Sequence, residues 1–224
     1  MTSGNPHLDQ DWVHWGVPVA QARLVLYAVH GRDGSPDYMI EALDRLALPG
    51  VHAVVPAAAG QSWWPQSFLA TRAANQPMLD HALGTVEAHR ARLQAEGVGP
   101  DRLVLLGFAQ GACLLAEHLL RARKRCAAAV LFTGGYVGPA AHPWPRDTGL
   151  AGMPMLMATA RDDAWVPLQR FEETVAALKQ AGARVESHVD DDPFHQINDD
   201  MLLEAHRFLR GLAGRPAPCP STNG

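Results

Sequence analysis

Three segments of the chain carry residues that could perform acyl-transfer chemistry, and they follow one another in a fixed order. The first is G-F-A-Q-G at residues 107–111, the second contains Asp162 and Asp163, and the third contains His195. A nucleophile followed by an acid and then by a histidine is the chain order of one type of catalytic triad. In such a triad the histidine carries the proton, and the acid orients its ring and stabilises the imidazolium.

The G-F-A-Q-G segment matches a sharp turn between a strand and a helix, with one substitution. Apolar residues precede it and an apolar helical stretch follows it. The central residue of this turn has a strained backbone, and its neighbours two positions away must be small, as Gly107 and Gly111 are. The turn also aims the backbone N–H of Gln110 at the place where an oxyanion would form. The central position, where a serine would attack, is Ala109, whose methyl group cannot attack a carbonyl.

Two aspartates compete for the acid position. Both follow the apolar run at residues 153–158, and an orienting acid must lie just beyond the end of a strand. The spacing D-x-x-V-P favours Asp163, and Asp162 is interpreted as a solvated loop charge. On its own, His195 would be interpreted as a structural loop histidine. Its place behind the turn and the acid favours a catalytic role instead.

A second oxyanion donor is expected from the turn H-G-R at residues 30–32. This turn follows the apolar run at residues 24–29, in the place of the loop that supplies such a donor. We predict the backbone N–H of Arg32 as the partner of the Gln110 N–H. An ordinary β-turn is the alternative interpretation. The Arg32 side chain is expected either to meet an acidic group of the substrate or to be solvated.

Metal and thiol chemistry are less favoured. The three aspartates at residues 190–192 with His195 could form a metal cluster, but consecutive loop carboxylates are usually solvated and no second histidine has ligand spacing. We predict no metal and no cofactor. Cys113 is expected to be a buried thiol rather than a substitute nucleophile. Together with Cys126 and Cys219 it forms neither a disulfide framework nor a C-x-x-C pair.

The composition is that of a globular protein. The chain has 224 residues, of which 47% are hydrophobic and 19% charged, and its net charge is −4. Such a charge gives no indication of a nucleic-acid or anionic-membrane partner. Neither a secretory signal nor an apolar run long enough to span a bilayer is recognised. We therefore expect a cytoplasmic protein without a membrane span.

Short apolar runs alternate with longer amphipathic stretches along the chain. Most of the runs lack polar alternation, as expected of strands buried on both faces of a parallel sheet. The runs are residues 24–29, 51–56, 103–107, 127–132, 153–158 and 183–189. The helical stretches are expected to begin at Pro36 after Ser35, at Asn75 and Pro77, at Gly111, at Pro167 and after Asn198. The sequence thus predicts an α/β fold with a mostly parallel, doubly wound sheet.

The chain is expected to form one domain over residues 1–212. Residues 139–152 are rich in glycine, proline and polar residues, so they predict a surface loop that is too short to be a cap domain. Residues 213–224 have the composition of a flexible C-terminal tail.

Taken together, the motifs resemble the phospholipase/carboxylesterase family of α/β-hydrolases, which includes acyl-protein-thioesterase-like enzymes. The matching segments are residues 30–35, 61–65, 75–77, 107–112, 163–167 and His195, and they extend over most of the chain. The resemblance implies an α/β-hydrolase fold without a cap domain and a Ser–Asp–His hydrolase of carboxylic esters or thioesters, with no cofactor. It also implies a homodimer as one candidate assembly. Ala109 departs from the family's serine, Asp33 from its usual glycine, and residues 192–194 from its Gly-rich approach to the histidine.

Aromatic residues are expected around the site, because ligands of open α/β sheets bind at the C-terminal edge of the strands. Trp63 and Trp165 are the favoured pocket walls, whereas Trp64 is equally well explained by core packing. Small to medium acyl or aryl esters are the expected substrates, and a phthalate-type monoester facing Arg32 is the most specific candidate. The predicted substrate contacts are His30, Gly31, Trp63, Trp64, Tyr136, Trp165 and Phe194.

The alanine at position 109 allows more than one interpretation. A replaced serine would leave an esterase that binds its ester without cleaving it, and the retained Asp163, His195 and both glycines favour this hypothesis. A naturally non-catalytic, ligand-binding relative and a thioesterase on the same fold are the alternatives. The sequence leaves open whether the alanine is natural or engineered.

Overall fold

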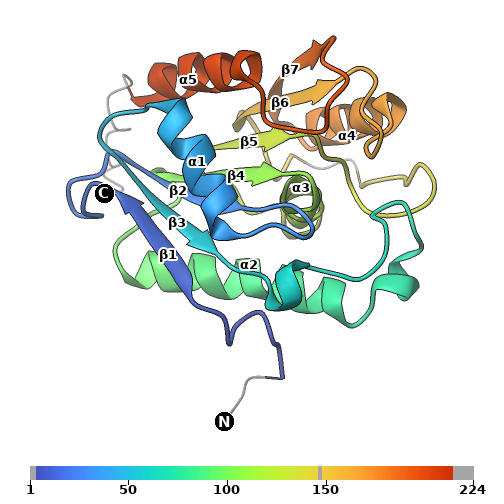
Figure 1. The fold of residues 1–224 in the computed structure, drawn as a ribbon, viewed down its shortest axis with the longest axis horizontal. Coiled ribbons are helices and arrows are strands. Elements are labelled where there is room, and N and C mark those ends of the chain that lie inside the picture. The colour runs from blue at the N-terminus through green and yellow to red at the C-terminus, as the bar shows by residue number, and fades with distance from the viewer. Residues whose placement is uncertain (1–3, 146–147, 214–224) are drawn as a thin grey trace, which may run out of the picture.

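The protein is built around one seven-stranded sheet, described by a computed structural model that covers residues 4–145 and 148–213. The strand order is β1-β3-β2-β4-β5-β6-β7 (Figure 1). Strand β1 pairs antiparallel with β3, and all other pairs are parallel. The predicted α/β sheet is therefore confirmed. The strands are β1 (Trp12–Gly16), β2 (Leu24–Val29), β3 (Val51–Pro56), β4 (Leu103–Phe108), β5 (Ala128–Phe132), β6 (Pro154–Ala160) and β7 (Arg184–Asp190).

Strands β2 to β7 correspond to the six apolar runs of the sequence, and most of their residues are buried. Of these six strands, β7 at the edge of the sheet is the least buried, and Asp190 is its one buried residue. Strand β1 was not predicted. Its sequence, W-V-H-W-G, is half exposed and contains no aliphatic run, because β1 is the opposite edge strand and contacts the sheet through β3 alone. A search of the sequence for buried apolar strands therefore misses β1.

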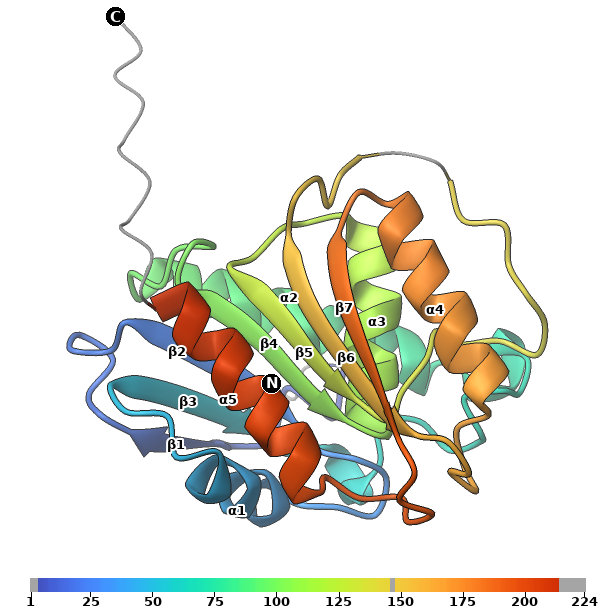
Figure 2. The same ribbon diagram turned by 90° about the horizontal axis from the view of Figure 1, so that it is seen from above.

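The α-helices of the described ranges cover the two faces of the sheet, as Figure 2 shows. Helices α1 and α5 pack on one face and bury Met39, Leu43, Met201 and Leu209 against it. Helices α2, α3 and α4 pack on the other face. This is the doubly wound arrangement that parallel crossovers produce. The helices are α1 (Pro36–Leu46), α2 (Met78–Ala95), α3 (Gln110–Ala122), α4 (Leu168–Gln180) and α5 (Asp199–Ala213), with short 3₁₀ helices η1 (Ala59–Gln61) and η2 (Arg72–Asn75).

The helix starts follow the predicted signals only in part. The Asn198 side chain accepts a hydrogen bond from the backbone N–H of Met201 at 2.8 Å, which caps α5. Ser35 precedes α1 in an extended conformation, but its side chain makes no capping bond. Asn75 does not open α2. It belongs to η2, and its buried amide instead bonds the loop before it.

The loops that carry the predicted site all leave the same edge of the sheet. They follow β2, β4, β6 and β7, which are parallel strands, so their carboxyl ends lie side by side. The connection between β5 and β6 contains neither helix nor strand in its described part, which leaves this edge without a cap domain. Within the described ranges, no helix is long and apolar enough to cross a membrane. The predicted flexible tail was residues 213–224; Ala213 ends α5, and the rest lies outside the described residues.

Candidate active site

Ala109 occupies the tight turn between β4 and α3. Its backbone has φ 50° and ψ −117°, a conformation that residues with side chains rarely adopt. The flanking glycines are required by contact. A Cβ atom on Gly107 would lie 2.8 Å from the backbone N of Ala112, and one on Gly111 would lie 2.1 Å from the carbonyl O of Val29. The turn is therefore fixed by close backbone packing on both sides.

The carboxylate of Asp163 and the imidazole of His195 are hydrogen-bonded. His195 Nδ1 lies 2.7 Å from Asp163 Oδ2, and the other carboxylate oxygen accepts the backbone N–H groups of Trp165 and Val166 at 2.8 and 3.0 Å. Burial would raise the pKa of Asp163, but the bonds from His195 and the two N–H groups outweigh it and hold the pKa below its usual value. The ionised carboxylate fixes the ring with Nδ1–H as donor, so that Nε2 of the neutral imidazole carries a free lone pair. Asp162 is exposed.

Two aromatic side chains lie near the His195 ring. Its centroid is 5.1 Å from that of Phe108, the residue before Ala109, and 6.5 Å from that of Trp165. Gly31 lies directly against Ala109, because a Cβ atom on Gly31 would come within 3.0 Å of the Ala109 methyl. The structure thus brings the turn, the acid–histidine pair and the H-G-R turn to one place at the edge of the sheet.

The two predicted oxyanion donors flank Ala109. Gln110 is the first residue of α3, where backbone N–H groups lack intrahelical acceptors. Neither its N–H nor that of Arg32 donates to a backbone acceptor outside helices and strands in the part of the chain that the structure describes. Asp33 has φ 53°, which is the left-handed region that favours glycine. This explains why glycine is usual here in the resembling family.

Five of the seven predicted substrate contacts are buried, namely His30, Gly31, Trp63, Trp64 and Tyr136. His30 is 1% exposed and bonds the protein through both ring nitrogens, and Trp63 donates its indole N–H to the His30 carbonyl at 3.0 Å. Trp64 packs in the same core cluster. Tyr136 donates its hydroxyl to Glu173 at 3.0 Å. Sequence position near the edge of the sheet does not distinguish a core aromatic residue from one that lines a pocket.

Trp165 and Phe194 are the exposed aromatic residues of the site. Trp165 is 71% exposed and Phe194 is 65% exposed. The first lies two residues after Asp163 and the second directly precedes His195. Both loops therefore present an apolar side chain to solvent beside the imidazole, where an apolar part of a substrate could lie.

The Arg32 guanidinium does not face the space in front of Ala109 as a free charge. It donates to the carbonyl oxygen of Pro65 at 2.7 Å and also to that of Gln66. The side chain is thus bonded to the protein's own loop while it stays exposed, an arrangement that neither expectation included.

A buried carboxylate behind the site was missed by sequence reasoning. Glu117 of α3 is fully buried, pairs with Arg72 of η2 and with Arg121, and accepts the backbone N–H of Val137 at 3.0 Å. It thus joins α3 to the loops after β3 and β5. The signal was a single acidic residue in the apolar helix that follows the turn, but nothing in the sequence names its distant partners.

The alternative chemistries find no support in the local contacts. The three aspartates at residues 190–192 bond His188, Arg161 and the amides of Gln196 and Asn198 rather than converging with His195. Among the described residues, no three potential ligands converge on a metal position. Burial raises the pKa of the Cys113 thiol to about 12, so this group is not a nucleophile at neutral pH.

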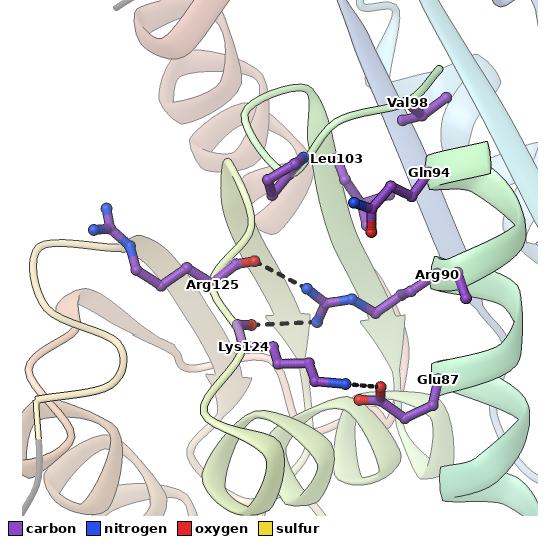
Figure 3. A pocket seen from close by; sticks show the side chains of 9 residues that line it. Glu87, Arg90, Gln94, Val98, Leu103, Lys124 and Arg125 are labelled. Carbon is purple, nitrogen blue, oxygen red and sulfur yellow. Dashed lines mark hydrogen bonds and ion pairs between the residues drawn. The ribbon is translucent and has the colours of Figure 1, made fainter. Parts of the chain in front are cut away.

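A separate cavity lies at the opposite end of the strands. It is shown in Figure 3 and is lined by Glu87, Arg90, Lys124 and Leu103 among others. Leu103 is the first residue of β4, whereas Ala109 follows its last. Arg90 donates to the carbonyls of Lys124 and Arg125, which fixes the loop between α3 and β5. This cavity is therefore separate from the acid–histidine pair.

Comparisons with known proteins agree with this geometry. Residues 30–213 match the family described as Phospholipase/Carboxylesterase. The crystal structure of a phospholipase/carboxylesterase from Dyadobacter fermentans DSM 18053 is 31% identical, with a TM-score of 0.82 over 89% of this chain and 96% of that chain. A carboxylesterase from Mesorhizobium loti is 19% identical, with a TM-score of 0.71 over 85% and 90% of the two chains, and shows the same fold. No match was found among curated proteins.

Proposed function

The chain belongs to the phospholipase/carboxylesterase family, and we propose that its site is that of a serine carboxylic-ester hydrolase in which Ala109 occupies the position of the nucleophile. One observation carries this proposal: the hydrogen bond between His195 and Asp163 beside a strained turn flanked by two obligatory glycines. Neither the strain at residue 109 nor the hydrogen-bonded acid–histidine pair serves folding as such.

With a serine at position 109, the reaction would proceed in two acyl-transfer steps. The serine oxygen would bond to the carbonyl carbon while its proton passes to Nε2 of His195, and Asp163 would stabilise the imidazolium. The N–H groups of Arg32 and Gln110 would hold the negative carbonyl oxygen. His195 would then protonate the leaving alcohol, and a water molecule, activated by the same ring, would release the acid.

With alanine at this position, the protein is expected to bind the ester without forming the acyl-enzyme. Acyl and aryl esters of small to medium size are the proposed substrates, because the edge of the sheet has no cap domain and Trp165 and Phe194 offer exposed apolar surface. Thioesters are cleaved by the same chemistry, and we include them in the proposal.

Ala109 itself favours one second candidate, a binding protein that does not catalyse. Both candidates retain the same ligand site, so ligand binding cannot separate them. Only the first requires that the remaining groups lie in working geometry.

The test is the substitution Ala109→Ser. Removal of a triad nucleophile costs on the order of a million-fold in turnover, so the serine variant should hydrolyse a p-nitrophenyl ester series at least about 10⁴-fold faster than the parent. The double variant Ala109→Ser, His195→Ala is the control, and it should return to the parent rate. A folded serine variant, judged by circular dichroism, that stays at the parent rate on all esters and thioesters would favour the binding protein.

A further inference from the structure

The side chains of Arg32 and Gln110 bond to one and the same loop. This loop, residues 62–66, is called the tether loop below. The Arg32 guanidinium donates to the carbonyls of Pro65 and Gln66. The Gln110 amide accepts the backbone N–H of Trp63 at 2.8 Å and donates to the carbonyl of Trp64 at 2.9 Å. Two residues that are 78 positions apart, one on each side of Ala109, are thereby held to a common support.

The tether loop is itself held firmly by the core. Trp63 and Trp64 are 0% and 1% exposed. The backbone N–H of Gln66 donates to Asn75 Oδ1 at 2.8 Å, and the amide of this buried asparagine donates to Ser67 at 3.0 Å. Because the loop is anchored at its centre and at its end, it can fix the groups that bond to it rather than follow them.

His30 fixes the donor of Arg32 from the other side of the peptide. The backbone N–H of Ala58 donates to His30 Nε2 at 3.1 Å, so the neutral ring must carry its proton on Nδ1. That Nδ1–H donates to the carbonyl oxygen of Gly31 at 2.7 Å. The Gly31 carbonyl and the Arg32 N–H belong to one planar trans peptide and point in opposite directions. Holding the carbonyl therefore sets the direction of the N–H.

We propose that Arg32 and Gln110 each act twice: their backbone N–H groups form the oxyanion site, and their side chains, bound to the tether loop, set the position of those N–H groups. This inference rests on the function proposed above. It makes the Arg32 guanidinium a positioning group rather than a binding site for a substrate charge. Arg32 is exposed, so water alone could satisfy its guanidinium. That the guanidinium nevertheless bonds to two carbonyls of the tether loop supports the positioning role.

The experiment compares Arg32→Met with Arg32→Lys in the Ala109→Ser background. Loss of one oxyanion donor costs about 10²- to 10³-fold in kcat, and a donor that is displaced rather than lost should cost less, about 10- to 100-fold. Arg32→Met should lower kcat by that amount with KM nearly unchanged, and Arg32→Lys, which can still reach one carbonyl, should recover part of it. A trifluoromethyl ketone, which forms a tetrahedral adduct, should lose affinity in the same order.

Arg102→Met is the matched control. The Arg102 guanidinium also donates to loop carbonyls, those of Val19 and Ala22 at 2.9 and 2.7 Å and that of Gly97 at 3.4 Å, but Arg102 directly precedes β4, away from Ala109. Its loss should affect stability without lowering kcat. If Arg32→Met keeps the kcat of the serine parent, or falls no further than Arg102→Met, the inference is overturned while the proposed function stands.

A second measurement uses the chain with Ala109 and needs no activity. A short-chain carboxylate, the product of ester hydrolysis, should place one oxygen between the two N–H groups, and its Kd can be followed through the amide resonance of Gln110. Arg32→Met should weaken this binding several-fold, whereas Arg102→Met should not. An unchanged Kd in Arg32→Met would contradict the inference even if Ala109→Ser proved inactive, in which case the proposed function would fail separately.

Discussion

The two sides of the candidate site are built in opposite ways. On the donor side, which comprises residues 30–32, Gln110 and the tether loop, main-chain and side-chain groups are bonded to one another and the aromatic residues are buried. On the base side, the loops of residues 161–167 and 191–197 share the Asp163–His195 bond, but their aromatic residues Trp165 and Phe194 face solvent.

This difference separates two tasks that one site must perform. Groups that stabilise a transition state have to be in place before the reaction, because a donor that must move first loses part of its effect. Groups that accept the apolar part of different esters gain from an open surface. We therefore expect substitutions on the donor side, and of the acid–histidine pair, to act on kcat, and substitutions of the exposed aromatic residues to act on KM.

The largest effect on kcat should come from loss of the hydrogen bond between Asp163 and His195 on the base side. In the Ala109→Ser background, Asp163→Asn should lower kcat by about 10⁴-fold, because an amide can donate to Nδ1 and stabilise the wrong tautomer of His195. Asp162→Asn is the matched control and should change little, since Asp162 is exposed. Steady-state kinetics on one p-nitrophenyl ester are sufficient. Large loss in Asp162→Asn with full activity in Asp163→Asn would reverse the assignment of the acid.

A smaller effect is expected at the exposed aromatic residues. Trp165→Ala and Phe194→Ala should each raise KM for a medium-chain ester by about 5- to 30-fold, which corresponds to a partial loss of 1–2 kcal/mol of apolar contact. The same substitutions should leave kcat within about twofold and should have less effect on an acetate ester. A fall in kcat with constant KM would show that the base side, too, is held in place by its aromatic residues, and the contrast between the two sides would disappear.

The backbone of the site could be predicted from the sequence because it depends on local rules. The need for glycine at 107 and 111 follows from steric contacts within one turn. The roles of Asp163 and His195 follow from their positions after parallel strands, whose carboxyl ends lie at the same edge of the sheet. Among the described strands, β2 to β6 are apolar runs. In each case the signal lies within a few residues of the feature.

The support of the site could not be predicted, because it depends on contacts between distant residues. Trp63 and Trp165 look alike in sequence, as aromatic residues in loops, yet the first is buried beside His7 and His30 and the second is 71% exposed. The same holds for Arg32, whose bonds go to carbonyls more than 30 residues away. Backbone carbonyls leave no trace in residue types, so no pattern could reveal them.

The smallest expected effect concerns the pH dependence of the free energy of unfolding. It tests whether the donor side, rather than the base side, makes the fold less stable in acid. Burial lowers the pKa of His7, as it does that of His30. The His7 ring accepts the N–H of Ala59 through Nδ1 and therefore donates through Nε2 to the carbonyl of Trp63 in the tether loop. A neutral buried histidine stabilises the native state fully above its unfolded pKa of about 6.5. This contribution is lost as pH falls below that value toward the folded pKa, because the unfolded chain takes up the proton first.

His7→Asn separates this contribution from the rest, since the Asn oxygen can still accept the N–H of Ala59 but does not titrate. The variant should be less stable than the parent at pH 8, by about 1–3 kcal/mol for the lost bond to Trp63. Its free energy of unfolding, measured by urea unfolding, should however fall less between pH 8 and pH 5.

His142→Asn, at an exposed position, is the control, and its free energy of unfolding should fall with pH as that of the parent does. Asp163, whose pKa is held below its usual value of about 3.9, contributes only to losses at lower pH than this window. If the free energy of unfolding of His7→Asn fell as steeply between pH 8 and pH 5 as that of the parent, the acid-sensitive groups would lie outside the donor side. The bond between His7 and the tether loop would then not be the cause of the loss of stability in acid.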